Sequence, residues 1–291
     1  MTKAPRESHR HAPASKQKKT FALALGGGGA RGIAHVAVLE ALDEMGVKPA
    51  AIAGSSIGAA IGAAYAAGMT GKAIRHHLVR IAHRRPETLS KLITARATTL
   101  SQLFSAGFGN PMVLDAEKLC AAFLPPDIPG EFEGLSIPLI VMTTDLHGRK
   151  EVPFSSGPLA SALAASLAVP GLLQPVSIGG RLFVDGAAVN PLPFDHLRGR
   201  ADIIVAVDSS IGPAKEQTLP DPWECLFMTL QVMGHTIISE KLKHGAPDLV
   251  IRPNVGIFRM LDFFQASAIL RVADAVKAEV REQLKTRLEL K

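Results

Sequence analysis

The sequence predicts an α/β sandwich built on a mainly parallel β-sheet. Three observations lead to it: short, continuously apolar runs typical of buried strands, helix-length segments between them, and glycine clusters where strands give way to helices. The chain has 291 residues, of which 47% are hydrophobic and 20% charged. A chain of this size and composition can bury a substantial core, so disorder as its main state is excluded.

The first elements are marked by their end signals. Residues 21–25, Phe-Ala-Leu-Ala-Leu, form a short buried strand that four glycines end abruptly. A helix over about 33–45 follows, because apolar residues recur on one face and Gly46 ends the run. A second strand at 50–53 leads through a turn into an alanine-rich helix that Gly68 closes.

The rest of the chain continues the alternation. Buried strands are expected at 136–144, 203–207 and 249–251, and a tight hairpin is expected where 176–178 and 181–184 flank two glycines. Further helices are expected at 72–83, 115–123, 157–168, 222–243 and 263–290. We divide the chain into a disordered basic tail (1–20), a main domain (21–209) and a mainly helical extension packed on it (210–291).

The net charge of +6 is concentrated in two segments. Residues 1–20 hold six lysines and arginines against one glutamate, and residues 72–96 hold seven against one, so the remainder of the chain is mildly acidic. Aromatic residues make up only 5%, which disfavours base stacking, and we expect no nucleic-acid partner. The two basic segments suit peripheral contact with an anionic membrane, where each cation contributes about 1 kcal/mol.

Nothing in the sequence predicts a membrane span or a leader. The charge-free runs 49–71 and 152–180 are long enough, but the glycines of the first and the prolines of the second do not suit a lipid-facing helix. The apolar stretch at 21–25 is too short for a signal peptide. Cys120 and Cys225 match no metal or redox spacing, and we expect both to be reduced and buried in a cytoplasmic protein.

The first chemical motif is Gly54-Ser55-Ser56-Ile57-Gly58, which lies between a predicted strand and a predicted helix. In a G-x-S-x-G turn the central serine is exposed at the start of the helix, where developing negative charge is favoured. Glycines flank it because a Cβ would clash where the strand and the helix converge. Ser56 is therefore the candidate nucleophile.

A second glycine-rich turn, at residues 26–32, follows the first strand and opens a helix, so its backbone N–H groups can face an anion. A dinucleotide site would need a carboxylate at the end of the next strand, and none is there. A phosphate-binding P-loop would need a G-K-[ST] sequence, which is also missing. An oxyanion hole for a carbonyl under attack by Ser56 remains.

A serine nucleophile needs a base, and several titratable residues lie near predicted strand ends or within the folded region: Asp145, Asp185, Asp208, His35, His147, His196 and His235. Asp185-Gly186-Ala187 stands out because it directly follows an apolar strand. The glycine lets the backbone turn and another group approach the carboxylate.

Together these motifs resemble the signatures of patatin-like phospholipases. The matching residues are Gly27-Gly28-Gly29-Ala30-Arg31-Gly32, Gly54-Ser55-Ser56-Ile57-Gly58 and Asp185-Gly186-Ala187, in that order, and Ala165-Ser166-Leu167-Ala168-Val169-Pro170-Gly171 is similar to a further block of the family. The resemblance covers about 21–209. It implies a three-layer α/β/α sandwich and a Ser-Asp dyad that hydrolyses lipid acyl esters, with no cofactor and no metal.

Carried onto this chain, the resemblance implies that Ser56 is the nucleophile, Asp185 the proton acceptor, and the loop of Gly27, Gly28 and Gly29 the oxyanion hole. Burial among apolar neighbours would raise the pKa of Asp185 toward that of a useful base. The motif positions Arg31, Gly32, Gly54, Gly58, Gly186 and Ala187 support this site. We expect Arg31 to orient the glycine loop by bonding its carbonyls, or to attract a phosphate head group.

Two other functions stay open. A His-dependent esterase or acyltransferase would use His196 or His235, which both follow Asp185 as in α/β-hydrolases. The other is a non-catalytic binding or regulatory protein on the same fold. We expect His35 to face a neighbouring helix, and Asp145 and Asp208 to cap strand ends.

Two further expectations concern the surroundings of the site. We expect His76, His77 and His83 to lie on a solvated face of a basic helix. The segment 89–125 is expected to cover the substrate, with candidate acyl contacts at Leu100, Leu103, Phe104, Phe108, Met112 and Val113.

Overall fold

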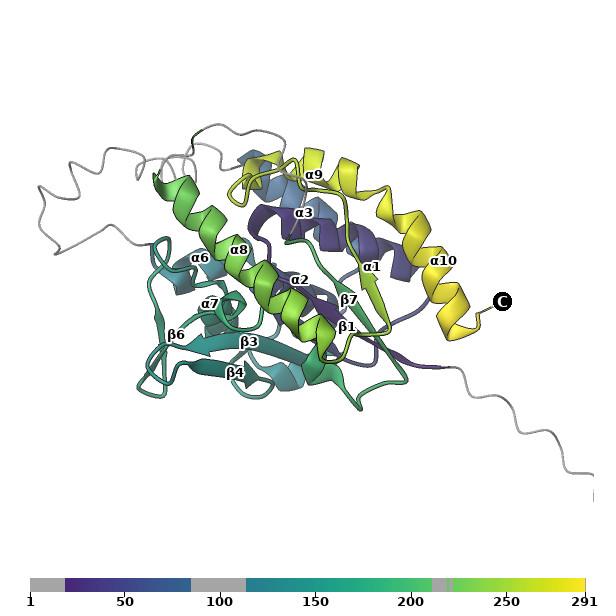
Figure 1. Ribbon diagram of the computed structural model, residues 1–291, viewed down its shortest axis with the longest axis horizontal. Helices are drawn as coiled ribbons and strands as arrows, with labels where there is room; N and C mark the ends of the chain where they lie inside the picture. The colour runs from purple at the N-terminus through teal and green to yellow at the C-terminus, as the bar shows by residue number, and fades with distance from the viewer. Residues whose placement is uncertain (1–18, 85–113, 211–218, 220–221, 291) are drawn as a thin grey trace, which may run out of the picture.

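The computed structural model describes residues 19–84, 114–210, 219 and 222–290 (Figure 1). Its centre is an eight-stranded sheet in the order β5-β6-β3-β2-β1-β7-β8, with β4 also paired to β3. The strands are β1 Phe21–Leu25, β2 Ile52–Ser55, β3 Leu139–Asp145, β4 Lys150–Phe154, β5 Val176–Ile178, β6 Arg181–Asp185, β7 Ile203–Val207 and β8 Leu249–Ile251.

Helices cover this sheet: α1 His35–Glu44, α2 Ile57–Ala66, α3 Gly71–Arg84, α6 Ala116–Phe123, α7 Leu159–Leu167, α8 Pro222–Lys243, α9 Ala266–Ala273 and α10 Val276–Leu288. The 3₁₀ turns are η1 Gly29–Ala34, η2 Phe132–Gly134, η3 Gly186–Ala188, η4 Phe194–Leu197 and η5 Phe263–Gln265. The predicted helix at 263–290 is thus broken after α9. None of the helices in the described ranges combines the length and the apolar character that a bilayer span requires.

The sheet is mainly parallel, as the sequence predicts. Strands β3, β2, β1, β7 and β8 are parallel neighbours, and the predicted hairpin β5–β6 is antiparallel. Sequence analysis missed β4, which pairs antiparallel with β3. Its residues are half-buried or exposed, and Pro153 tolerates this position because β4 pairs along one edge only.

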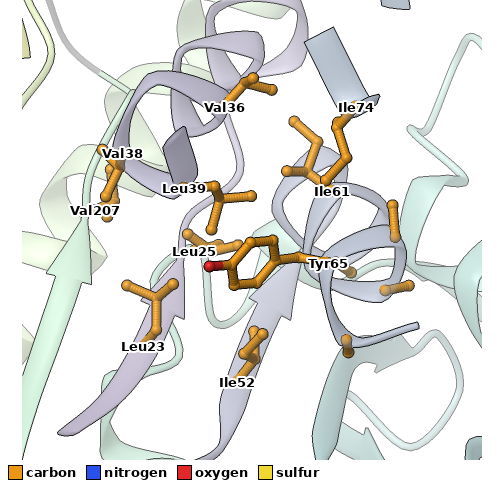
Figure 2. Close-up of a cluster of buried hydrophobic side chains, with 14 of the residues drawn as sticks. Leu23, Leu25, Val36, Val38, Leu39, Ile52, Ile61, Tyr65, Ile74 and Val207 are labelled. Atoms are coloured by element: carbon orange, nitrogen blue, oxygen red, sulfur yellow. The ribbon is translucent and has the colours of Figure 1, made fainter. Parts of the chain in front are cut away.

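Alternate residues of the strands face two separate cores. Leu23 and Leu25 of β1 belong to a large cluster that includes Leu39 of α1 and Tyr65 of α2 (Figure 2). The small residues between them, such as Ala24, face a second cluster formed with η4 and the C-terminal part of α8. The period-2 pattern therefore places helical elements on both faces, which confirms the three-layer α/β/α sandwich.

The C-terminal helices are part of the same large core. Leu270 of α9 and Val280 of α10 are fully buried in the cluster that contains β1 and α1. Figure 1 shows α10 lying alongside α1. The division into 21–209 and 210–291 stays a prediction.

Two strands meet end to end on one edge of β3. β4 pairs with β3 continuously from Val141 to Asp145, so it occupies one edge of β3 throughout this stretch. β2 pairs with β3 up to Met142, and β6 pairs with it from Thr143 onward, so both share the other edge. The last residue of each strand, Ser55 and Asp185, thus lies opposite consecutive residues of β3.

Candidate active site

Ser56 lies on a strained turn between β2 and α2. Its backbone has φ 55° and ψ −128°, a conformation that non-glycine residues rarely adopt. A Cβ at Gly54 would lie 2.6 Å from the backbone nitrogen of Ala59, and one at Gly58 would lie 2.6 Å from the carbonyl oxygen of Gly26. The close approach that the sequence predicts for these two glycines is confirmed.

A buried serine of α7, Ser166, stabilises this turn through a hydrogen bond. The N–H of Ser56 donates to Oγ of Ser166, at 2.9 Å, and Ser166 is fully buried in α7. A strained residue persists only where its surroundings fix it, and this bond supplies one such restraint. The sequence places Ser166 in a family-like block but gives it no role; the available signal was a serine within an otherwise apolar helix that also contains Ser161.

Ser56 and Asp185 are in direct contact. The hydroxyl of Ser56 donates to Oδ2 of Asp185 at 2.6 Å, and the N–H of Ala187 donates to Oδ1 of Asp185 at 2.8 Å. Both residues are nearly inaccessible to solvent. The end-to-end arrangement of β2 and β6 brings the two together, and the turn at Gly186 fits because a Cβ there would collide with the backbone of Met142.

Burial raises the pKa of Asp185 to about 6, although the hydrogen bonds from Ser56 and Ala187 favour the ionised carboxylate and oppose the shift. No cation lies among the groups that shift this pKa in the described part of the chain. The carboxylate is ionised above about pH 6, and its affinity for a proton is higher than that of an exposed aspartate. These are the properties of a general base that works near neutral pH.

The glycine loop presents two amides rather than three. The N–H of Gly27 donates to the carbonyl of Pro191 at 2.9 Å, so it is not available to a ligand. The N–H groups of Gly28 and Gly29 have no acceptor within the described residues. A Cβ built on Gly27 would lie 3.5 Å from the Cβ of Ser56, which places the loop against the serine. Of the three glycines predicted to form an oxyanion hole, Gly28 and Gly29 therefore remain candidates.

Residues from the C-terminal part of the chain form hydrogen bonds with the glycine loop and the turn that follows it. The N–H of Ala30 donates to the carbonyl of Met260 at 2.7 Å. The prediction that Arg31 bonds the carbonyls of the glycine loop is wrong: its Nη2 donates to Oε1 of Gln231 at 2.5 Å, and its buried Nε has no partner among the described residues. Gly32 packs directly against Ile57, where any side chain would collide.

An apolar cavity opens beside these groups. Its volume is about 300 Å³, at the lower end for small-molecule sites, and Ser56, Asp185 and the glycine loop line it. Most of its wall is hydrophobic, including Ile61, Leu119, Leu172 and Met233. The described part of the predicted cover, residues 114–125, contributes to the wall. The six proposed acyl contacts between Leu100 and Val113 lie outside the described residues.

Among the residues that the structure describes, no histidine bonds Ser56 or Asp185. Neither His196 nor His235 lines the cavity or bonds Ser56 or Asp185. His196 instead faces Glu151, with 3.1 Å between Nε2 and Oε1, and His235 lies near Ser239 on α8. A His-dependent triad therefore has no structural basis here.

Two other histidines depart from expectation. His35 does not face a neighbouring helix: its Nε2 donates to the carbonyl of Gly26, at 2.8 Å, and burial lowers its pKa to about 4. A neutral imidazole thus supports the start of the glycine loop. His77 is not solvated, because it is buried in the cavity wall and bonds the carbonyl of Phe123 at the end of α6.

Three further expectations can be compared with the structure. Asp145 and Asp208 lie buried at strand ends, where their carboxylates accept N–H groups from Gly148 and Ser210, as predicted. Cys120 is buried, but Cys225 is exposed on α8, against the prediction. Both thiols are free.

One cluster in the described ranges has residues of the metal-binding kind. Oxygen and nitrogen atoms of Glu151, Asp195 and His196 lie within 4.8 Å of one another. The ammonium group of Lys241 bonds Asp195 at 2.6 Å, and Asn190 donates to Glu151 at 2.9 Å. Protein groups thus already satisfy these acceptors, and nothing in the cluster calls for an ion.

The site defines the class of protein: an α/β/α sandwich with a serine turn, an aspartate and a glycine loop at adjoining strand ends. The family model for patatin-like phospholipases matches residues 23–198. The chain belongs to the patatin-like phospholipase family.

Individual relatives agree with this assignment. An uncharacterized NTE family protein of Mycobacterium bovis is 40% identical over 199 residues, which cover 67% of this chain and 51% of that protein. Lysophospholipase nte1 of Neosartorya fischeri is 30% identical over 294 residues, covering 92% of this chain and 18% of the fungal protein. The chain spans about half the length of the mycobacterial relative.

Two solved structures are similar over most of the chain. VipD from Legionella pneumophila has a TM-score of 0.49 at 15% identity, covering 91% of this chain and 67% of that protein. Human GIVD cytosolic phospholipase A2 has a TM-score of 0.49 at 13% identity, covering 93% of this chain and 63% of that protein.

Proposed function

We propose that the protein is a serine hydrolase of lipid acyl esters that uses Ser56 and Asp185 as a catalytic dyad. Asp185 removes the hydroxyl proton while Oγ of Ser56 attacks the ester carbonyl carbon. The C–O bond to the alcohol then breaks, and the proton on Asp185 passes to the departing alkoxide. An acyl-serine remains.

Water completes the cycle. Asp185, again ionised, takes a proton from a water molecule that attacks the acyl carbon, and Ser56 leaves with that proton as its hydroxyl is restored. In both steps the carbonyl oxygen gains negative charge. In this proposal the free N–H groups of Gly28 and Gly29 stabilise the charge, a contribution that commonly amounts to about 3 kcal/mol per donor.

A single observation carries the proposal: the 2.6 Å hydrogen bond from the Ser56 hydroxyl to a buried carboxylate with a raised pKa. A buried carboxylate without a cation is costly, and such strain is found most often where it serves a reaction. The strained backbone of Ser56 supports the same interpretation.

The cavity supports a lipid ester as the substrate class. A predominantly hydrophobic wall beside the serine suits the acyl chain of a phospholipid, a lysophospholipid or a related ester. The similarity to a fungal protein named lysophospholipase supports the same class. Lipid mass spectrometry after incubation with the protein and with Ser56→Ala would identify the ester that is consumed.

Turnover of p-nitrophenyl esters and labelling by a fluorophosphonate test the proposal. We expect both in the wild-type protein and neither in Ser56→Ala, and we expect kcat/KM to rise with pH through about 6, as Asp185 ionises. Wild-type protein that neither turns over esters nor is labelled at Ser56 would overturn the proposal. That result would favour a non-catalytic protein on the same fold.

A further inference from the structure

The middle of α8, from residue 226 to residue 238, has an exposed side and carries no ionic side chains. From residue 226 to residue 238 it contains no Asp, Glu, Lys or Arg, and His235 is its only titratable residue. Figure 1 shows α8 running diagonally across the near side of the molecule. Helices on the surface of a folded protein normally show charged residues to water.

Large apolar side chains occupy the solvent side of this helix. Val232 is 65% exposed, Met233 55%, Met228 47% and Leu226 42%. At 100° per residue these four fall within an arc of about 160°, while Phe227 and Ile238 lie on the opposite, buried side. We call Leu226, Met228, Thr229, Val232, Met233 and Thr236 the outer face of α8.

The two threonines of the outer face have their hydroxyls satisfied within the helix. Oγ1 of Thr229 donates to the carbonyl of Cys225 at 2.8 Å, and Oγ1 of Thr236 donates to the carbonyl of Val232 at 3.0 Å. Such bonds remove the main cost of moving a hydroxyl out of water. Because both hydroxyl protons are used within the helix, the outer face offers few hydrogen-bonding groups to another protein. Protein–protein interfaces typically form about one hydrogen bond per 100–200 Å².

The outer face is continuous with the cavity. Met233 is more than half exposed, yet it lines the cavity that contains Ser56. Leu230 and Gly234, on the adjoining side of the same helix, also line it. One helix thus carries an apolar surface from solvent to the cavity that contains the dyad.

We propose that the outer face of α8 docks on the surface of a lipid bilayer, so that an acyl ester reaches Ser56 without crossing water. The inference rests on the proposed lipid ester hydrolase. A helix of this kind lies in the interface with its apolar side among the head groups and acyl chains, rather than spanning the bilayer. Because the outer face carries no charge, its binding persists at high salt.

This docking differs from electrostatic contact through the basic segment 72–96. In the described part of that segment, Arg75 is already paired with Glu40 and Asp274, at 2.6 Å each, so its charge is largely compensated. Contact through the remaining cations stays a prediction, and it would weaken as salt rises. Salt dependence therefore separates the two modes.

Flotation with phosphatidylcholine vesicles tests the proposal, using Ser56→Ala protein so that no lipid is consumed. We expect binding that about 0.5 M salt leaves unchanged. The double substitution Met228→Glu and Val232→Glu, at two positions that do not line the cavity, is expected to lower binding at least tenfold. The matched control is Leu146→Glu, which changes a residue outside α8 that is 46% exposed and is expected to have no effect.

The same substitutions in the protein with Ser56 intact separate this inference from the proposed function. We expect unchanged turnover of a soluble short-chain ester and at least tenfold slower hydrolysis of vesicle lipid. Full soluble-ester turnover without vesicle binding would overturn the docking proposal alone, as would a wild-type dimer that the double substitution converts to monomer in light scattering. If the wild-type protein did not hydrolyse the soluble ester, the proposed function would instead be overturned.

Discussion

Two buried carboxylates lie in different parts of this molecule and have opposite pKa shifts. Asp185 is 5% exposed, has only hydrogen-bond donors as partners, and has a pKa raised to about 6 by burial. Glu40 on α1 is 3% exposed, and burial would raise its pKa too, but hydrogen bonds and attraction from Arg75 and Lys277 outweigh that and lower it. Both side chains are nearly inaccessible to solvent, and their neighbours differ: two cations bond Glu40, whereas only an O–H and an N–H donor bond Asp185.

The comparison separates a structural carboxylate from one suited to chemistry. Glu40 accepts two hydrogen bonds from Arg75 at 2.6 Å and one ion pair from Lys277 at 2.5 Å, which ties α1 to α3 and α10. A carboxylate stabilised by cations in this way has a lower affinity for protons. Asp185 keeps its affinity and touches a serine hydroxyl. Similar side chains are thus suited to stability in one place and to proton transfer in the other.

The largest expected effect is on activity. Asp185→Asn keeps the shape of the side chain but removes the base, so we expect kcat/KM for a soluble ester to fall by about 10³-fold, within the usual range for a general base. Glu40→Gln, the same carboxylate-to-amide change, is the matched control and is expected to retain at least about a third of the activity at 25 °C. Equal losses in the two variants would contradict the assignment of the base.

The second effect is on stability. Glu40→Gln leaves Arg75 and Lys277 without their shared anion, although Asp274 still contacts both. Because the two cations are partly exposed, we expect a loss of about 2 kcal/mol, below the range for a fully buried pair. Urea unfolding followed by circular dichroism measures it.

Glu44→Gln supplies the control for that loss. Glu44 is also paired with Lys277 and Arg281, but its side chain is 35% exposed. Exposed pairs contribute little, so we expect a change below about 1 kcal/mol. An effect as large as that of Glu40→Gln would show that burial does not set the cost.

Much of the candidate site could be predicted from sequence, because its motifs follow strands. Glycines around Ser56 and an aspartate after an apolar strand are local signals, and their strand-end positions predict a common edge. The parallel sheet could also be predicted, because its buried strands are continuously apolar runs, which are likewise a local signal. The exposed strand β4 lacked that signal and was missed.

The contacts that complete the site were beyond the sequence, since each depends on groups far apart in the chain. The carbonyl of Pro191 occupies the Gly27 amide, and the carbonyl of Met260 fixes Ala30. Backbone carbonyls are the same in every residue, so no residue type marks them. Ser166 and Gln231 act through partners more than 100 residues away. The hydrogen bond from His35 to the carbonyl of Gly26 likewise could not be predicted, because it depends on how the chain turns between the two residues.

The last expected effect is a difference between the two carboxylates in how stability depends on pH. Asp185 has a folded-state pKa above its unfolded value, so its contribution to stability is present below the unfolded value of 3.8 and is lost as pH rises through about 6. Glu40 has a lowered folded-state pKa, so its contribution is present above the unfolded value of 4.5 and is lost as pH falls through the folded one.

Relative to the wild type, Asp185→Asn should therefore gain stability as pH rises from about 4 to about 7.5, by about 2 to 3 kcal/mol. Glu40→Gln should be less stable at about pH 7.5, and its deficit should be smaller at about pH 4, below the unfolded value of 4.5. Urea unfolding of the three proteins at both pH values measures the differences. Titrations elsewhere, including that of His35, cancel in each difference. If both variants changed in the same direction with pH, the opposite shifts of the two carboxylates would be wrong.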